Sequence, residues 1–424
     1  KRVNIETGEA RELAVNLTYT VDVPETRLVV HASRLVDGTN ETAKNDVDIV
    51  IEGNRIGSIE PHVEDLHAGT VVDASGLTVM PGLIEWHSHL QPDFGEAAGR
   101  AHLAFGVTTV RSPGGIPYEA VEEREASDAN LRVAPRYFTT GHLMEYERVY
   151  YKMGIAIASP RHLELELRRA QVLQYDLLKS YVRMTDVLQK RIVEFAHDIG
   201  VPASTHEIYP AALVGMDGSE HTSGTSRRGY SPKIGTLQQS YADVSQIFGA
   251  TGTIWCPMVS RTGLARLWEL EPEMRMDPRF SLYPDWMQRQ VSGQGGRLGA
   301  ASQAASGEIP GTLQMVMNIQ KAGGKVVAGT DSPNAFNLHG ELMAYVMAGM
   351  TPYQALRAAT VVPAEALGLD AGSIEVGRLA DLVIVEGNPL EDITATHRVR
   401  HVVSNGRAYS VEDLVAGTAG GPMP

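Results

Sequence analysis

Residues 81–89 read Pro81-Gly82-Leu83-Ile84-Glu85-Trp86-His87-Ser88-His89, an apolar run that ends in two histidines. If this run is a strand, its period-2 alternation directs both imidazoles to the same side, where they can converge on one cation. A His-x-His pair is a weak signal alone. Catalytic residues of α/β barrels lie at the carboxyl ends of the strands, however, and that position favours a functional interpretation.

Outward from this stretch, residues 81–370 alternate between short apolar runs and helical segments, a pattern typical of a parallel sheet covered by helices. The strand candidates are 82–85, 107–110, 137–140, 177–179, 201–205, 218–220, 253–255 and 325–329. Eight strands are the number that a closed barrel requires. We therefore predict a (β/α)8 TIM barrel, with the long stretch from 258 to 311 as a candidate substrate lid.

The two ends of the chain predict a second, smaller domain. Short β-branched runs separated by Asp-Gly and Gly-Asn turns occupy residues 28–80 and return near the other end, within 371–409. We predict that these two segments form one composite β-sandwich domain. Residues 1–27 are assigned to an N-terminal extension or linker, and residues 410–424 to a tail.

Composition narrows the classes of function. The 37 basic and 51 acidic residues give a formal charge of −14 without a basic block, so we expect no nucleic-acid partner. No apolar run approaches the roughly 18 residues of a membrane helix, so no membrane span is predicted. The single cysteine, Cys256, excludes a disulfide framework and a thiolate metal cluster. Any metal must therefore be held by imidazole and oxygen ligands.

Three more residues that can bind metal stand at the carboxyl ends of strand candidates, namely His206, His221 and Asp331. Each of them alone is most simply a polar loop residue. Together with His87 and His89, five such residues at strand ends favour a metal site at the mouth of the barrel.

Lys179 lies in an apolar strand candidate, where burial of an unpaired ammonium is costly. Two interpretations are open. Lys179 can pair with a carboxylate at the barrel mouth, or a depressed pKa can free its amine to add carbon dioxide, giving a carbamate that bridges two metals. The surrounding ligand-type residues favour the carbamate.

The order His-x-His, Lys, His, His, Asp resembles that of the amidohydrolase superfamily. The similar branch is binuclear with a carboxylated lysine and includes imidazolonepropionase-like amidohydrolases and Xaa-Pro or Xaa-Arg dipeptidases. Two further motifs support the resemblance: Val-Met-Pro-Gly-Leu-Ile at 79–84 and Gly-Arg-Leu-Ala-Asp-Leu-Val-Ile-Val at 377–385. Residues 4–23 look like the joint after which TolB-like β-propeller proteins carry a C-terminal amidohydrolase, which would make this chain a fragment or processed form.

The resemblance implies two divalent cations, a carbamate on Lys179 and a metal-bridging hydroxide as the nucleophile. The more buried cation is assigned to His87, His89, Lys179 and Asp331, and the more exposed one to Lys179, His206 and His221. Zinc suits such nitrogen and oxygen ligands best, although manganese, iron or cobalt also fit. Asp331 would accept the proton of the nucleophile as general base and return it to the leaving nitrogen.

Substrate contacts are predicted from residues near the strand ends. His142 would polarise the carbonyl or hold its oxyanion. Arg227, Arg228 and Tyr230 follow His221 and suit a substrate carboxylate, although a solvated basic loop explains them equally well. Tyr181, close to Lys179, is a further candidate for a substrate contact.

The function predicted is hydrolysis of an amide bond in a small N-acyl amino acid or dipeptide. A lactonase, an ester hydrolase or another C–N hydrolase remains an alternative because the same hydroxide attacks either carbonyl. Lys179 disfavours a mononuclear deaminase, and the ligand set disfavours a non-catalytic scaffold. Relatives of this kind are often homo-oligomers. Localisation, exported or cytoplasmic, stays open.

Overall fold

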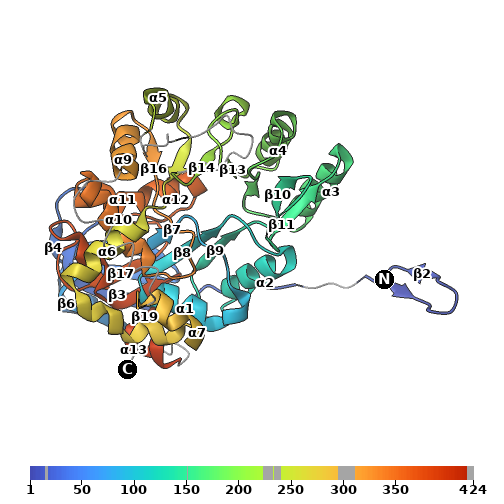
Figure 1. The fold of residues 1–424 in the computed structure, drawn as a ribbon. Helices are drawn as coiled ribbons and strands as arrows, with labels where there is room; N and C mark the ends of the chain where they lie inside the picture. The colour runs from blue at the N-terminus through green and yellow to red at the C-terminus, as the bar shows by residue number, and fades with distance from the viewer. Residues whose placement is uncertain (15–17, 150, 223–232, 234–239, 295–310, 418–424) are drawn as a thin grey trace.

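The computed structural model describes residues 1–14, 18–149, 151–222, 233, 240–294 and 311–417, which form a mixed α/β fold (Figure 1). Eight short parallel strands occupy the eight positions predicted from the sequence. They are β7 (Leu83–Glu85), β8 (Val107–Ser112), β9 (Arg136–Thr139), β12 (Leu178–Lys179), β13 (Ala203–Thr205), β14 (Gly218–Glu220), β15 (Ile254–Cys256) and β16 (Lys325–Val326). All eight strand predictions are confirmed.

These strands form two sheets, whereas one closed (β/α)8 barrel was predicted. The two sheets and their covering helices are called the barrel below. Strands β7–β9 make a three-stranded parallel sheet, and β12–β16 make a five-stranded one. Backbone hydrogen bonds bridge the two gaps. At the β16–β7 gap Trp86 donates to Ala328 O at 3.0 Å, and Thr330 and Asp331 donate to His87 O at 3.2 and 2.7 Å; at the β9–β12 gap Asp176 donates to Thr139 O at 2.9 Å. At the second gap the Asp176 carboxylate accepts from the Thr139 N–H at 2.8 Å, so a side chain occupies the place of a ladder bond.

Helices follow most of these strands and pack outside them (Figure 1). They are α1 (Glu96–Ala104), α2 (Pro117–Asp128), α3 (Pro160–Val172), α4 (Asp186–Asp198), α5 (Ala242–Thr251), α9 (Gly311–Lys321), α10 (Asn337–Ala348), α11 (Pro352–Ala358) and α12 (Val361–Leu367). A small parallel pair, β10 (Leu143–Tyr146) and β11 (Gly154–Ile157), interrupts the alternation after β9. The main hydrophobic core lies between strands and helices and includes Trp255, Phe105 and Phe336.

The predicted substrate lid at 258–311 is more ordered than a loop where it is described. It forms α6 (Ser260–Leu270), two 3-10 turns, η4 (Pro272–Met276) and η5 (Pro278–Leu282), and α7 (Asp285–Val291). Trp268 and Phe280 of this segment are buried in the main core. Residues 295–310 lie outside the described residues. The part from 258 to 294 is therefore a packed layer of the barrel.

Both ends of the chain meet in one seven-stranded sheet, here called the composite sheet. Its order is β19-β18-β17-β6-β3-β4-β5, formed by β3 (Arg27–Leu35), β4 (Lys44–Glu52), β5 (Arg55–Pro61), β6 (Thr70–Pro81), β17 (Leu382–Val385), β18 (Val399–Ser404) and β19 (Arg407–Ser410). Strands β6 and β17 pair antiparallel, which joins the two segments edge to edge. The predicted β-sandwich is not confirmed, because the described residues form this single sheet.

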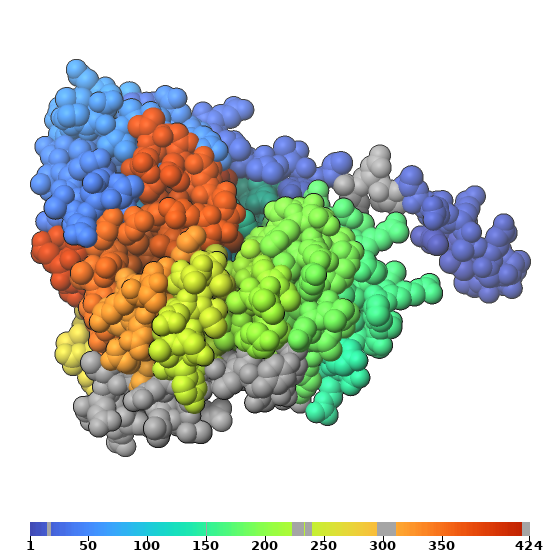
Figure 2. Space-filling view, turned by 90° about the horizontal axis from the view of Figure 1, so that it is seen from above, coloured from blue at the N-terminus to red at the C-terminus, as the bar shows by residue number. Residues whose placement is uncertain are grey.

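One face of the composite sheet carries its own apolar cluster, which includes Val30, Ile49 and Leu382. In Figure 2 the segments from the two ends of the chain, blue and red, form one lobe beside the barrel. A short hairpin of β1 (Arg2–Val3) and β2 (Ala10–Arg11) lies away from this body (Figure 1). Part of the predicted tail forms α13 (Val411–Ala416), whose Leu414 is fully buried.

Among the described helices, none is both long enough and apolar enough to cross a membrane.

Candidate metal centre

The two histidines of the 81–89 stretch meet Asp331 at the carboxyl ends of β7 and β16. The Nε2 atoms of His89 and His87 lie 3.1 and 3.6 Å from Asp331 Oδ1. The backbone brings the carboxylate there, since Asp331 donates its N–H to His87 O at 2.7 Å and adopts a left-handed φ of 51°. Such backbone strain in a residue other than glycine clusters at functional sites. These three residues form one group able to hold a metal ion.

Glu85 ties these two strand ends together and was not predicted as a site residue. Its buried carboxylate accepts from the His87 N–H at 3.0 Å and from the Thr330 N–H at 2.9 Å, and its second oxygen bonds the Thr330 hydroxyl at 3.0 Å. Burial raises the pKa of Glu85 to about 8, although these donors oppose the shift. Glu85 therefore sets the positions of both the His87 and the Asp331 backbones.

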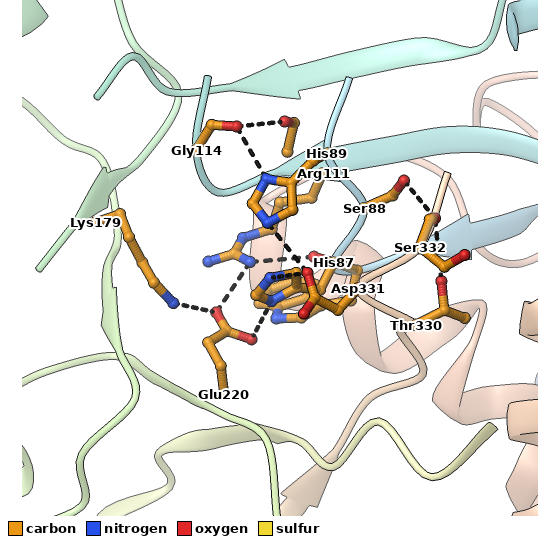
Figure 3. Close-up of polar contacts among 12 residues, drawn as sticks. His87, Ser88, His89, Arg111, Gly114, Lys179, Glu220, Thr330, Asp331 and Ser332 are labelled. Atoms are coloured by element: carbon orange, nitrogen blue, oxygen red, sulfur yellow. Dashed lines mark hydrogen bonds and ion pairs between the residues drawn. The ribbon is translucent and has the colours of Figure 1, made fainter. Parts of the chain in front are cut away.

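Glu220 is the buried hub of the site, and the sequence prediction missed it (Figure 3). Its Oε2 lies 2.9 Å from His87 Nδ1, and its Oε1 lies 3.1 Å from Arg111 and 3.5 Å from Lys179 Nζ. A carboxylate at Nδ1 favours the tautomer in which Nε2 keeps its lone pair for a metal. The signal in the sequence was an acid inside a three-residue strand, directly before a predicted ligand.

Lys179 is buried, with 1% of its surface exposed, and its Nζ makes no hydrogen bond to another described residue. Desolvation lowers its pKa to about 8, and the neighbouring Arg111 adds to the decrease while Glu220 opposes it. Glu220 is the carboxylate partner that one of the two interpretations required, yet Arg111 and His87 already share it. A buried amine that is partly neutral near pH 8 is the form that can add carbon dioxide.

His206 and His221 follow β13 and β14 and extend the cluster. Their rings lie 4.5 Å apart, and His221 lies 5.3 Å from the His87 ring. Burial lowers the pKa of His221 to about 3 and that of His206 well below its usual value, with further decreases from nearby cationic groups. Both imidazoles are therefore neutral at physiological pH, the form that binds metal.

All six residues predicted as metal ligands thus meet at one place. The fit to divalent cations rests on the buried Lys179 amine, which makes no hydrogen bond to a described residue, and on the imidazoles gathered around the Asp331 carboxylate. The thiol of Cys256 is buried and its pKa is raised by desolvation, so it stays protonated and contributes no thiolate.

The predicted substrate residues have different outcomes. Tyr181 lies against the cluster, with its ring 4.7 Å from that of His206. His142 makes no hydrogen bond, ion pair or ring contact with the cluster among the described residues; its Nδ1 is buried without a hydrogen-bond partner, and the charges that act on it are Glu166 and Arg169 of α3. Arg227, Arg228 and Tyr230 lie outside the described residues, so their role stays a prediction.

Lys233 is a third site residue, after Glu85 and Glu220, that the sequence prediction missed. It is fully buried, and its Nζ donates to His206 O at 2.9 Å, to Ser219 Oγ at 3.0 Å and to Glu220 O. Desolvation lowers the pKa of Lys233 to about 7. The amine therefore links the ends of β13 and β14, which His206 and His221 directly follow. These two histidines are the ones assigned to the more exposed cation.

Comparison with known proteins shows which families and folds this chain is similar to. Residues 303–409 match the profile described as Amidohydrolase family. A dihydroorotase of Elusimicrobium minutum (strain Pei191) is 39% identical over 69 residues, which are 15% of this chain and 16% of that protein. The match therefore spans a small part of that curated relative.

Solved structures are similar over nearly the whole chain. A Xaa-Pro dipeptidase with bound methionine has a TM-score of 0.70 at 21% identity, covering 91% of this chain and 100% of that one. A putative prolidase from Bifidobacterium longum has a TM-score of 0.69 at 23% identity, covering 93% and 99%. At these identities the likeness shows the fold.

The family match confirms the resemblance to amidohydrolases over residues 303–409, and the solved structures confirm the fold that the resemblance implied. The matched segment contains both Asp331 and the motif at 377–385. The suggested link to TolB-like propeller proteins is not tested by these matches and stays a prediction.

Proposed function

We propose that this chain is a metal-dependent hydrolase that cleaves an amide bond in a small N-acyl amino acid or dipeptide. The observation that carries the proposal is the cluster of four imidazoles, the buried Lys179 amine and the Asp331 carboxylate at the ends of parallel strands. The Xaa-Pro dipeptidase and prolidase names of similar folds support the dipeptide class.

In this proposal His87, His89, Lys179 as a carbamate and Asp331 hold one divalent cation, and Lys179, His206 and His221 hold a second. The cations, zinc by preference of the ligand set, would supply Lewis-acid activation of water and of the substrate carbonyl. Glu220 fixes the His87 ring through its 2.9 Å contact with Nδ1, and Lys233 fixes the strand ends before His206 and His221.

Asp331 is the proton carrier in this proposal. Hydrogen bonding from His89 and the nearby histidines holds the pKa of its carboxyl well below the usual range, so it is ionised at any physiological pH. Its side chain is 41% exposed, which places it where substrate arrives, while His87 beside it is 2% exposed. An ionised carboxylate in that position can accept a proton from the attacking water and return it to the leaving nitrogen.

Five residues are proposed for the substrate side, and two of them belong to the described residues. Tyr181 packs against His206 and presents a hydroxyl that stays protonated, because burial raises its pKa. His142 stays the predicted group for the oxyanion, although the charges nearest to it belong to α3. Arg227, Arg228 and Tyr230 stay the predicted fork for a substrate carboxylate.

The alternative of lactone or ester hydrolysis uses the same residues, because Asp331 can serve either leaving group. Paired substrates separate the two: Xaa-Pro dipeptides and N-acyl amino acids against lactones and esters with the same acyl part. We expect the higher kcat/KM for the amides. Faster turnover of the esters or lactones alone would replace the amide proposal with the alternative.

The site itself is tested by metal content per chain and by hydrolysis, for the wild type and Lys179→Ala side by side. We expect the variant to lose both metal and turnover, and added bicarbonate to raise metal uptake of the wild type alone. A matched control is His197→Ala, which removes an exposed imidazole paired with Asp217 on the outside of the barrel. Equal metal content in the wild type and Lys179→Ala would reject the lysine as a ligand.

A further inference from the structure

A second group of histidines lies on the composite sheet, away from the barrel mouth. His31, Asp48, His62 and His67, here called the sheet cluster, each offer a ligand atom, and these atoms all lie within 4.8 Å of one another. None of the four was predicted as a site residue. The proposed hydrolase mechanism uses none of them.

The register of the sheet brings the first two residues together. His31 of β3 is the direct partner of Asp48 on β4, and on its other side it is the partner of Asp73 on β6. Directly opposed residues point to the same face of a sheet. That face is opposite the apolar cluster, because the neighbouring Val30 and Ile49 pack into the core on the other side.

The connection between β5 and β6 adds the other two imidazoles. His62 follows β5, and His67 follows the short turn η1 (Glu64–Leu66). This segment folds over the sheet face, where the Val63 N–H donates to Asp48 Oδ2 at 3.0 Å. Asp48 is fully buried underneath, while the side chains of His62 and His67 keep 25% and 24% of their surface exposed.

The distances suit a tetrahedral metal site. His62 Nδ1 and His67 Nε2 each lie 3.1 Å from Asp48 Oδ1. Ligand bonds of about 2.0–2.2 Å to zinc place neighbouring ligand atoms about 3.3–3.6 Å apart in a tetrahedron. The rings of His31 and His62 stack with centroids 3.9 Å apart, and one ring nitrogen of each lies within 4.8 Å of the other ligand atoms of the cluster.

The negative charge of the carboxylates around the sheet cluster also favours binding of a cation. Asp46 and Asp73 lie 3.2 and 3.5 Å from the two ring nitrogens of His31, in addition to Asp48 between the histidines. In the part of the chain that the structure describes, the ion pairs of these three carboxylates are all with histidines of the cluster. When one ring nitrogen of His31 binds the metal, the carboxylate at the other nitrogen gives the support that is usual for a ligating imidazole.

We propose that His31, Asp48, His62 and His67 bind one zinc ion in a structural site that fastens the β5–β6 connection to the composite sheet. Four protein ligands close the coordination sphere, which is the arrangement of structural zinc and leaves no position for a substrate. The proposal does not depend on the proposed hydrolase function, because it shares no residue with the barrel site.

Zinc binding is tested first in a chain that lacks all four barrel imidazoles, His87→Ala/His89→Ala/His206→Ala/His221→Ala, so that the zinc of the sheet cluster is counted separately. We expect one tightly bound zinc per chain to remain there and to disappear when His62→Ala/His67→Ala is added. The matched control adds His162→Ala/His197→Ala, which removes two histidines from helices on the barrel exterior. Retention of that zinc after loss of His62 and His67 would overturn the proposal.

A second measurement covers the case in which removal of the histidines impairs folding. X-ray absorption at the zinc edge, on the chain without the four barrel imidazoles loaded with one equivalent of zinc, is expected to show three imidazoles and one carboxylate oxygen. Zinc should also raise the unfolding temperature of this chain but not that of its Asp48→Asn derivative. A zinc coordination shell dominated by water, or an equal rise in the unfolding temperature of both chains, would reject the site. Failure of the barrel proposal would leave both results unchanged.

Discussion

Replacement of Glu220 by glutamine tests whether the barrel cluster is organised as a metal site. The substitution keeps the size of the side chain but removes the negative charge that His87 Nδ1, Arg111 and Lys179 share at 2.9, 3.1 and 3.5 Å. The amide can present either its oxygen or its NH2 group to His87. The tautomer with a free lone pair on Nε2 then loses its preference.

The magnitude follows from two separate effects. Loss of a carboxylate behind a ligating histidine costs about 10- to 100-fold in metal affinity, or about 1.4–2.7 kcal/mol. Arg111 also loses a buried partner, and breaking a buried pair costs about 3–5 kcal/mol of stability. We expect the lower end of that range, because Arg111 keeps its bonds to Trp86 O at 3.1 Å and to Ser204 Oγ at 2.8 Å.

The assay is competition for zinc with a chromophoric chelator, combined with urea unfolding of the metal-free chain. The control is Asp381→Asn, which removes a buried carboxylate paired with Arg136 at 2.6 Å, where a barrel strand meets the composite sheet. We expect both variants to lose stability and only Glu220→Gln to lose metal affinity. Unchanged zinc affinity in Glu220→Gln would refute the assignment of His87 as a ligand oriented by Glu220.

Three further results are expected. Asp331→Asn should reduce kcat by about 10²–10⁴-fold while metal analysis still finds bound metal, and near-normal turnover would remove Asp331 as proton carrier. Burial raises the pKa of Glu341 from 4.5 to about 8, so the folded chain binds more protons than the unfolded chain between these values and stability falls as pH rises. Urea unfolding from pH 5 to 8 should therefore show a decline that is smaller in Glu341→Gln, by up to about 4 kcal/mol, and parallel curves would contradict this. A Cβ on Gly263 would lie 1.8 Å from Gly340 O, so Gly263→Ala should separate α6 from α10 and cost about 1–3 kcal/mol, seen as a lower unfolding temperature; an unchanged temperature would show that the helices adjust freely.

The strands of the barrel could be predicted from the sequence because each is a short apolar run followed by a residue with metal-binding or polar chemistry. Whether the eight strands pair all the way round into one closed barrel could not be predicted, because closure depends on the local geometry of each pair of neighbouring strands. At the β9–β12 gap, for example, the Asp176 side chain takes the Thr139 N–H. The alternation of apolar residues near the two ends likewise indicates one buried face, but it does not distinguish one sheet of seven strands from two packed sheets.

The candidate site was predictable only where residue type and strand position coincide, as at His206 and Asp331. Glu220 and Lys233 have common side chains, and their importance comes from full burial beside particular partners. The sheet cluster shows the same limit: His31 and His67 are far from each other in sequence, and only the pairing of β3 with β4 and the fold of the β5–β6 connection bring them together.

The pairing of β6 with β17 makes the barrel an insertion within the composite sheet, since the chain leaves the sheet after Pro81 and returns at Leu382. The segments before and after the barrel therefore each contribute one strand, β6 or β17, to the contact that joins them, here called the seam. A chain cut once inside the barrel would yield two fragments that can rejoin through β6 and β17, so the sheet would act as a template for reassembly. Folding itself must close this interval of three hundred residues, and the late, slow step is expected at the seam.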